Sequence, residues 1–352
     1  MSRSSRSKWR GVNTTITSIT SPPRRKPLRT AADLLSPCNL KHIDSPTEVH
    51  TEDSHRWAVI LAGGDGERLL SLTRRIAGDD RPKQFCALSG GETLLKETQR
   101  RVARIIPRQQ TLLILTRTHE HYYTDEVKEI PSSHLFIQPR NHGTAPAITY
   151  ALTRLRRMDP RGLVAFFPCD HHFADDDAFA AHTDFAFAQA KSHPARVILL
   201  GMEPEGPEQA YGWIEPGSPL EADSAISISE VSRFWEKPCR QVAAHLMRRG
   251  CLWNSFVMVG TVGAFRNMIE RALPDLLASF ESICALADPE MEEKWLRALY
   301  LKEPATNFST EVLAARPSDL AVIHSSGLGW SDLGKPERVL SMLRLKRDGA
   351  NA

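Results

Sequence analysis

The sequence lacks three features that mark large classes of protein. No apolar run approaches the roughly 20 residues that a membrane-spanning helix needs, so we expect no membrane span. No internal repeat is found, and the absence of hexapeptide repeats argues against a β-helix domain. The remaining composition, with 41% hydrophobic and 25% charged residues, is ordinary for a soluble globular protein.

Cysteine is scarce, and its spacing does not suit a metal site. No two cysteines form a C-x-x-C pair, so the sequence does not predict zinc. Six cysteines scattered through a large chain favour free thiols in a reducing compartment, and we therefore expect a cytoplasmic protein. The six residues are Cys38, Cys86, Cys169, Cys239, Cys251 and Cys284.

Acidic residues are missing from the start of the chain. Residues Met1 to Ala32 hold eight Lys or Arg and no Asp or Glu. They are rich in Ser, Thr and Pro and show no periodic apolar face, so we expect residues 1–55 to be a disordered basic tail. A transit peptide, or contact with nucleic acid or anionic lipid, remains an alternative for this tail. For the protein as a whole we expect no nucleic-acid partner, and no secretory signal, because no apolar core follows the basic residues.

The most informative stretch that is present runs from residue 57 to residue 85, WAVILAGGDGERLLSLTRRIAGDDRPKQF. The short apolar run Trp57 to Ala62 predicts a buried strand, and the glycines after it predict a strand-to-helix turn. Glycines let backbone N–H groups approach an anion, and the start of a helix adds partial positive charge. Arg68 and Lys83 supply two full charges. The stretch therefore predicts a polyphosphate site.

Two common phosphate loops do not fit this stretch. Leu69 stands where the dinucleotide fingerprint G-x-G-x-x-G has its last glycine, and no lysine directly follows the glycines, as a Walker A loop requires. A plain turn of an α/β protein is the remaining alternative. Arg68 and the segment Arg81 to Phe85 argue against that interpretation.

Strand-like and helical patterns alternate through the first half of the chain. The expected strands are Trp57–Ala62, Thr111–Thr116, Leu135–Gln138, Leu163–Pro168 and Ala195–Met202. The expected helices between them are Thr93–Ile106, His119–Glu129, Ala145–Met158 and Ala178–Ser192. Such alternation predicts an α/β fold with a Rossmann-like, mostly parallel sheet and helices on both faces. In these sheets the ligand lies at the carboxyl ends of the strands.

The second half is mixed. Tyr211–Glu215 and Ile226–Glu236 suggest strands of a small added sheet, and Trp253–Val259 and Leu320–His324 suggest further strands. The expected helices are Arg240–Arg249, Val262–Ala272, Pro274–Leu286, Glu290–Tyr300 and Lys335–Lys346. We expect residues 56–348 to form a single domain.

An aspartate follows a strongly apolar strand. Phe166 to Pro168 leads to Asp170, which should reach the ligand edge of the sheet. A carboxylate beside a polyphosphate is costly unless a cation lies between them, so we expect Mg²⁺. His171 and His172 also allow a zinc interpretation, but no second ligand pair has suitable spacing.

Taken together, these segments resemble the sugar-nucleotide pyrophosphorylases, nucleotidyltransferases that join a sugar 1-phosphate to an NTP. Pro82-Lys83-Gln84-Phe85 is most similar to the mannose-1-phosphate guanylyltransferase branch, and five ordered motifs between Trp57 and Arg347 match the family. Two features depart from its pattern. Ser71 replaces the usual proline, and Arg75 to Arg81 is longer than the usual spacer, which we expect to lengthen a mobile loop over the phosphates.

The resemblance implies a catalytic domain that makes a nucleotide-sugar and pyrophosphate, with GTP and mannose 1-phosphate as the favoured substrates and GDP-mannose as the product. Another hexose 1-phosphate with UTP or dTTP, or a catalytically silent relative that binds sugar nucleotides and a partner enzyme, are the alternatives. A second copy of the chain is a further candidate partner. The attacking phosphate is already ionised, so catalysis needs positioning and charge neutralisation but no general base.

The resemblance also implies roles for individual residues. Asp332, in the segment Trp330 to Gly334, would join Asp170 on Mg²⁺, although an N-cap before the helix near Lys335 would explain the same aspartate. The implied catalytic residues are Arg68, Lys83, Asp170 and Lys237. The implied nucleotide-binding residues are Leu61, Ala62, Gly63, Gly64, Gly66, Glu67, Thr144 and Pro168. The implied sugar-binding residues are Gly212, Glu215, Glu236 and Asn254.

Three residues depart from the guanylyltransferase pattern near the nucleotide and the sugar. His142 and Gly143 take the places of an Arg-Asn pair, so we expect a different contact with the nucleobase. Asn307 stands where the family often has aspartate, so a charge near the sugar is lost.

Overall fold

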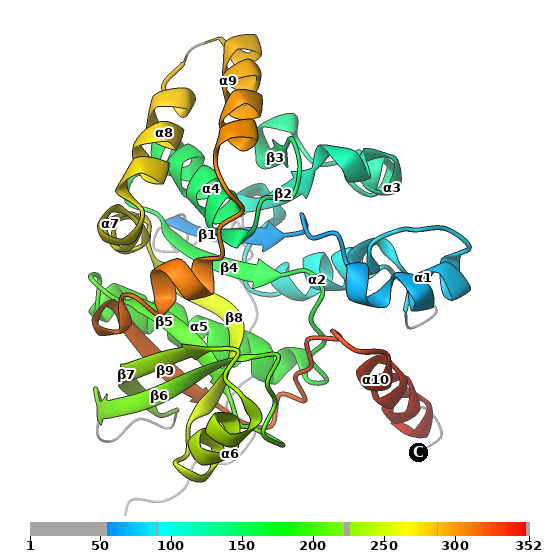
Figure 1. Ribbon diagram of the computed structural model, residues 1–352, viewed down its shortest axis with the longest axis vertical. Helices are drawn as coiled ribbons and strands as arrows, with labels where there is room; N and C mark the ends of the chain where they lie inside the picture. The colour runs from blue at the N-terminus through cyan, green and yellow to red at the C-terminus, as the bar shows by residue number, and fades with distance from the viewer. Residues whose placement is uncertain (1–54, 89–90, 222–225, 287, 350–352) are drawn as a thin grey trace, which may run out of the picture. The chain divides into compact units, whose positions relative to one another are not determined.

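The computed structural model describes residues 55–88, 91–221, 226–286 and 288–349, all of which belong to one compact unit (Figure 1). The expected disordered tail lies outside the described residues, apart from His55. The fold is α/β. Its described strands are β1 (Arg56–Leu61), β2 (Thr111–Thr116), β3 (Leu135–Gln138), β4 (Leu163–Pro168), β5 (Val197–Met202), β6 (Gly212–Pro219), β7 (Ile228–Glu236), β8 (Leu252–Thr261) and β9 (Leu320–Ser325).

The described strands form one nine-stranded sheet in the order β3-β2-β1-β4-β8-β5-β9-β7-β6. Strands β1 to β4 pair in parallel, as the alternating pattern predicts, and β5 pairs in parallel with β9. Strand β8 is antiparallel to both β4 and β5, so the sheet is mixed and not mostly parallel. The sequence pattern marks a strand but not its direction or its partner.

The small added sheet that the sequence suggested is not a separate sheet in the structure. Strands β6 and β7 form an antiparallel pair, but β7 also pairs with β9 and β6 also pairs with β8. These pairings satisfy backbone donors and acceptors that two separate sheets would leave at their edges. The proposed sugar-binding strands are therefore continuous with the strands that carry the glycine turn.

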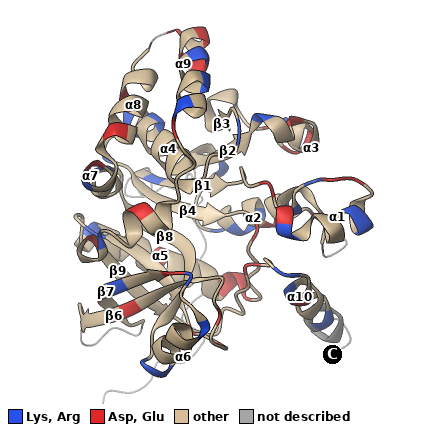
Figure 2. Ribbon diagram, in the orientation of Figure 1, with Lys and Arg blue, Asp and Glu red and all other residues tan. Residues whose placement is uncertain are grey.

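The helices of the described residues are α1 (Leu70–Ala77), α2 (Leu94–Val102), α3 (Glu120–Tyr123), α4 (Thr144–Met158), α5 (Asp176–Ser192), α6 (Arg240–Arg248), α7 (Val262–Ala272), α8 (Pro274–Cys284), α9 (Pro289–Lys302) and α10 (Pro336–Gly349). Basic and acidic residues are interspersed on α9 (Figure 2). None of the helices in the described ranges has both the length and the apolar character needed to cross a bilayer.

One expectation is confirmed in part and one is wrong. Helix α1 takes up the start of the stretch expected to lengthen a loop, whereas residues 78–80 follow it as a loop, with φ +81° at Gly78. The expected helix His119–Glu129 is broken into short turns around the four-residue α3. Both His119 and Tyr123 are buried and pack against Phe85, so tertiary contacts override the helical pattern there.

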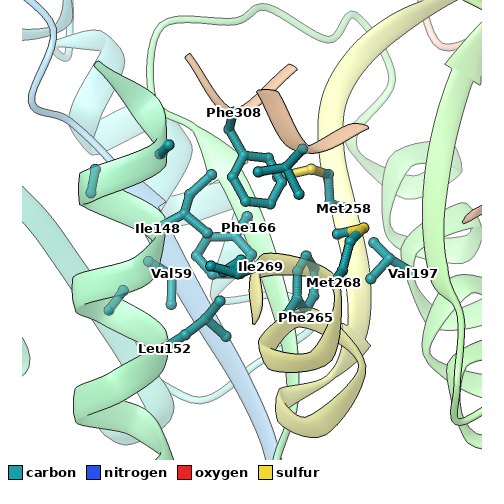
Figure 3. Close-up of a cluster of buried hydrophobic side chains, with 14 of the residues drawn as sticks. Val59, Ile148, Leu152, Phe166, Val197, Met258, Phe265, Met268, Ile269 and Phe308 are labelled. Atoms are coloured by element: carbon teal, nitrogen blue, oxygen red, sulfur yellow. The ribbon is translucent and has the colours of Figure 1, made fainter. Parts of the chain in front are cut away.

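Helices cover both faces of the sheet because successive strand residues point to opposite sides. On one face Val59 and Phe166 pack with Ile148 of α4 and Phe265 of α7 (Figure 3). On the other face the neighbouring Ile60 belongs to a second core cluster. Helices α2, α5 and α6 contribute to that second cluster.

The five cysteines in the described ranges are free thiols, as expected.

The sheet register places the functional segments at one edge. Leu61 is paired with Pro168, and Thr116 is paired with Gln138, so β1, β2, β3 and β4 end together. The glycine turn and Asp170 follow directly from these ends.

Candidate active site

The glycine turn after β1 is held against the segment that carries Lys83. Gly66 adopts φ +66°, and a Cβ atom there would lie 3.0 Å from the backbone nitrogen of Lys83 and 3.2 Å from Pro82 Cα. A side chain at this position would therefore be strained and would push the two segments apart. The Gln84 amide donates to the Gly64 carbonyl at 2.5 Å and to the Ala62 carbonyl at 3.2 Å. The turn and the Pro-Lys-Gln segment thus form one unit.

A cavity of about 420 Å³ lies over this unit. It brings together Arg68 beside the turn, Lys83 and Asp170, which are separated by up to about a hundred residues in the sequence. The complete lining is Gly64, Asp65, Gly66, Glu67, Arg68, Leu69, Lys83, Asn141, Asp170 and Gly334. Three of the expected catalytic residues and three of the expected nucleotide-binding residues therefore share one cavity.

Lys83 connects the two aspartates. Its side chain is buried, and its Nζ atom lies 3.0 Å from Asp170 Oδ2. The same Nζ donates to the Asp332 carbonyl at 2.8 Å and to the Leu333 carbonyl at 3.2 Å. Lys83 therefore ties the end of β4 to the loop before α10. The family resemblance did not indicate this positioning role.

Arg68 lines the same cavity with an exposed guanidinium. Among the described residues, no carboxylate forms an ion pair with it. A Cβ atom on Gly334 would lie 3.3 Å from Arg68 Nη2, so the guanidinium extends to the loop that carries Asp332. Arg68 is therefore placed to neutralise an anion bound in the cavity.

Both aspartates favour the ionised form. Burial by itself would raise the pKa of Asp170, but the Lys83 ammonium, with a further contribution from His171, holds this pKa below its usual range. Burial also opposes ionisation of Asp332, yet the groups around it hold its pKa below the usual range. The Gly334 amide donates to Asp332 Oδ1 at 2.9 Å, the Tyr211 hydroxyl donates to it at 2.8 Å, and Arg338 forms an ion pair with it.

A short backbone bridge brings the two aspartate loops together. The His172 amide donates to the Ser331 carbonyl at 2.8 Å, and the Ser331 amide donates back at 3.0 Å. Each partner lies within two residues of one of the aspartates. This β-type pairing therefore holds the loop that carries Asp332 next to the loop that carries Asp170.

His171 lies between the aspartate loops. Its Nε2 is 3.7 Å from Asp170 Oδ1, and the Trp330 indole donates to its Nδ1 at 3.2 Å. Burial lowers the pKa of His171. Because Nδ1 accepts from the Trp330 indole, the neutral ring carries its proton on Nε2, on the side of Asp170. Within the described ranges, no group of three or more His, Cys, Asp or Glu could hold a metal ion.

Asp170, which lines the cavity, and Asp332, which does not, are the two carboxylates that would hold a hard divalent cation completing its coordination with substrate. Asp170 and Asp332 offer oxygen atoms, and both carboxylates are ionised at neutral pH. The charge of Asp332 also makes Asp170 costlier to ionise. Mg²⁺ is commonly bound by one or two carboxylates together with substrate phosphates.

A second cavity, of about 340 Å³, adjoins the first, and Gly64, Asn141 and Asp170 line both. Its lining includes the expected residues Leu61, Gly63, Gly64, Thr144, Pro168 and Asp170, together with Ile114, Gln138, Asn141, Gly143, Ala147, His171, Phe256 and Asn307. Ala62 is fully buried and lines neither cavity. Its contribution is the carbonyl that accepts from Gln84.

The arrangement around residue 142 differs from what the motif suggested. The Arg140 guanidinium donates to the Tyr300 carbonyl, and the His142 ring hydrogen-bonds with the Glu303 carbonyl. Both side chains therefore face α9 and the loop after it. Asn141 and Gly143 line the cavity instead. Gln138 also lines it, with its oxygen accepting from the Tyr300 hydroxyl at 2.8 Å.

Three of the expected sugar-binding residues lie together on adjacent strands. A Cβ atom on Gly212 would lie 3.0 Å from Glu236 Oε2 and 3.3 Å from Asn254 Cβ. Glycine is therefore required for β6, β7 and β8 to bring these polar groups close. Lys237 follows with φ +47°, and its Nζ lies 3.1 Å from Glu236 Oε1.

Glu215 does not join this group. Side chains alternate along β6, so Glu215 shares a face with Trp213 and not with Gly212. It forms an ion pair with Arg249, and the Trp235 indole donates to it at 3.4 Å. The structure therefore gives no support to a sugar contact from Glu215.

Sequence reasoning missed the residues that hold Asp332. Arg338 of α10 pairs with both Asp332 and Glu208, and its guanidinium lies 4.4 Å from the centre of the Tyr211 ring. Lys335 adds a 3.0 Å ion pair with Glu208. Glu208 and Tyr211 lie just before β6, and their link to α10 depends on long-range contacts that no local sequence pattern encodes.

Comparison with known proteins shows which family this chain is similar to. A family model described as nucleotidyl transferase matches residues 57–347. The mannose-1-phosphate guanylyltransferase of Escherichia coli K12 is 28% identical over 291 residues, which are 80% of this chain and 58% of that protein. The alginate biosynthesis protein AlgA of Pseudomonas aeruginosa is 32% identical over 288 residues, or 78% and 56% of the two chains. The chain thus spans less than two thirds of the length of these curated relatives.

A solved structure shows a similar fold. The Thermus thermophilus protein described as mannose-1-phosphate geranyltransferase has a TM-score of 0.69 and 28% identity, and the match covers 82% of this chain and 79% of that chain.

Proposed function

The chain belongs to the nucleotidyl transferase family, and from this premise we propose that it transfers GMP from GTP to mannose 1-phosphate, giving GDP-mannose and pyrophosphate. The observation that carries the proposal is the cavity in which Arg68, Lys83 and Asp170 meet at the glycine turn. Such a site suits a polyphosphate beside ionised carboxylates. The E. coli relative is a mannose-1-phosphate guanylyltransferase, which supports GTP as the nucleotide and mannose 1-phosphate as the sugar substrate.

In the proposed reaction an oxygen of the sugar phosphate attacks the α-phosphorus of GTP. A new P–O bond forms while the bond between the α- and β-phosphates breaks, and pyrophosphate leaves with that electron pair. The sugar phosphate is already ionised, so no side chain needs to remove a proton. Arg68 would neutralise the leaving pyrophosphate, and Lys83 would fix Asp170 and add positive charge at the same cavity.

Asp170 and Asp332 are the residues proposed to hold Mg²⁺. When bound, the ion would neutralise charge on the reacting phosphates. The Tyr211 hydroxyl and the Gly334 amide both donate hydrogen bonds to Asp332. These contacts favour its ionised form and fix its orientation. The His171 ring would add a polar group close to Asp170, since its Nε2 lies 3.7 Å from Asp170 Oδ1.

The sugar is proposed to lie against Gly212, Glu236 and Asn254, whose polar groups converge on one face of the sheet. A carboxylate and an amide suit sugar hydroxyls, because between them they both accept and donate hydrogen bonds. Lys237 is proposed to contact the phosphate of the sugar. The free thiols also support a reducing location, and we propose the cytoplasm.

The direct test is pyrophosphate release by the purified chain with GTP, mannose 1-phosphate and Mg²⁺, with chromatography to identify GDP-mannose. We expect release to require both substrates. The silent-relative alternative predicts saturable binding of GDP-mannose without release of pyrophosphate. That outcome would overturn the proposal.

A further inference from the structure

The glycine turn carries a carboxylate into the cavity proposed for the polyphosphate. Asp65 lies between two glycines of the turn and lines that cavity together with Arg68 and Lys83. An anionic side chain at this place repels an anionic substrate unless other groups of the protein offset its charge. The proposed reaction gives Asp65 no task, so its role must follow from the groups around it.

Two further acids line this cavity, but their charges are offset in other ways. Asp170 is paired with Lys83, whose Nζ lies 3.0 Å from its Oδ2. Glu67 is exposed, so water weakens its interactions with other charges. Asp65 is half-buried, and no Lys or Arg of the described residues forms an ion pair with it.

Two side chains contact Asp65, one at each carboxylate oxygen. The His119 Nε2 lies 3.2 Å from Oδ1, and the Asn141 amide donates to Oδ2 at 2.8 Å. An ionised carboxylate only accepts, so the neutral His119 ring carries its proton on Nε2. Burial lowers the pKa of His119, which is therefore neutral at pH 7. The two contacts to Asp65 are hydrogen bonds to a charged acceptor.

The two donors come from different strands of the sheet. His119 lies three residues after the end of β2, and Asn141 lies three residues after the end of β3. The Asn141 oxygen accepts from the Gly143 amide at 3.1 Å, which orients its amide nitrogen toward Asp65. Asp65 therefore joins the turn after β1 to the loops that follow β2 and β3.

We propose that His119 and Asn141 are positioning residues that offset the charge of Asp65, so that the cavity accepts a polyphosphate. They act through Asp65 and not through the reacting atoms. The inference rests on the proposed function only because it requires a polyphosphate in this cavity. It does not depend on which base or sugar the chain uses.

Removal of either donor should weaken polyphosphate binding. The measurement is calorimetric binding of inorganic tripolyphosphate, and in parallel of GTP, to the full chain at a fixed Mg²⁺ concentration without sugar phosphate. His119→Ala and Asn141→Ala should each weaken binding about fivefold, the effect of one hydrogen bond. Asn141 is exposed, so its variant covers the case in which His119→Ala fails to fold. His245→Ala, at an exposed histidine of α6, is the control and should bind like the unchanged chain.

Asp65→Asn distinguishes an offset of charge from a direct contact or a purely structural one. This variant should bind tripolyphosphate at least as tightly as the unchanged chain, because it removes a repulsive charge. Adding His119→Ala or Asn141→Ala to it should change the affinity by no more than about twofold, since no charge is left to offset. If the donors only shaped the turn, the new amide oxygen would still accept from them, and the fivefold loss would persist.

The proposal is overturned if neither single variant weakens binding, or if the loss persists in the Asp65→Asn background. It is also overturned if neither tripolyphosphate nor GTP binds saturably. Failure of the proposed reaction gives a different result. In that case the ligands bind with the expected effects of the variants, but no GDP-mannose forms when mannose 1-phosphate is added.

Discussion

Lys83 is the side chain on which the candidate site depends most. The sequence predicts that Lys83 lies beside phosphate, because it belongs to a Pro-Lys pair that follows the glycine turn. It could not predict that the ammonium would also pair with Asp170 and donate to the carbonyls of Asp332 and Leu333. Those last two contacts join segments about 250 residues apart, and no local pattern encodes them.

Carboxylate substitution tests the site at the scale of single residues. We expect Asp170→Asn and Asp332→Asn each to lower the turnover rate at least about a hundredfold, since each removes charge next to the reacting phosphates. Pyrophosphate release at saturating Mg²⁺ is the measurement. Asp125→Asn, which alters an exposed aspartate that pairs with Lys128, is the control and should retain full turnover. Near-normal rates in either site variant would remove the metal assignment.

At the scale of elements, the local sequence pattern predicts well whether a segment is a helix or a strand and where it begins and ends, provided that its apolar periodicity and its breakers are clear. The bounds of β2, β3, β4 and α7 are as expected from apolar periodicity and breakers. The partners of β6 and β7 were missed, because pairing depends on backbone groups of distant strands. The helix expected at 119–129 failed because burial of two side chains outweighs helical periodicity.

An ion pair joins α2 to α5 and offers a stability test. Arg101 is 4% exposed, its Nε lies 2.6 Å from Asp176 Oδ1, and its guanidinium lies 5.2 Å from the centre of the Phe173 ring. Asp176→Ala would leave this guanidinium buried without its carboxylate. We expect the free energy of unfolding at pH 7 to fall by about 3 kcal/mol, measured by urea titration.

The control and the pH dependence follow from the same contact. Asp177 is 87% exposed, so Asp177→Ala should cost no more than about 1 kcal/mol. Burial opposes ionisation of Asp176, but Arg101 and Arg100 lower its pKa below the usual value. Its stabilising effect is therefore complete above about pH 4 and is lost as the pH falls through the lowered pKa. An equal loss of stability for both variants would contradict this account.

At the scale of the whole molecule, the alternating pattern of the first half predicts that functional segments meet at the carboxyl edge of the sheet. That expectation is confirmed for the glycine turn and Asp170, which line one cavity. The role of α10 could not be predicted, because its Arg338 reaches Asp332 and Glu208 only in the folded chain. Local periodicity predicts the α/β fold class, but it does not predict that α10 packs against the candidate site.

Removal of Met1 to Ser54 tests the domain boundary. This segment has no periodic apolar face, and the first strand begins at Arg56. The cut keeps His55, whose ring lies 2.8 Å from Asp159. We expect the truncated protein to keep its melting temperature and its turnover. A large loss of either, measured beside the full chain, would show that the removed segment stabilises the domain.

The most direct test of the central claim is the kcat/KM for pyrophosphate release with GTP, UTP and dTTP at a fixed concentration of mannose 1-phosphate. A wrong base leaves buried polar groups of the site unpaired, which can change rates by several powers of ten. Gln138 and Asn141 are two of the polar side chains that line the 340 Å³ cavity proposed to hold the nucleotide. The account predicts that GTP gives the highest kcat/KM, by at least about a hundredfold. A higher value with UTP or dTTP would contradict the guanylyl assignment.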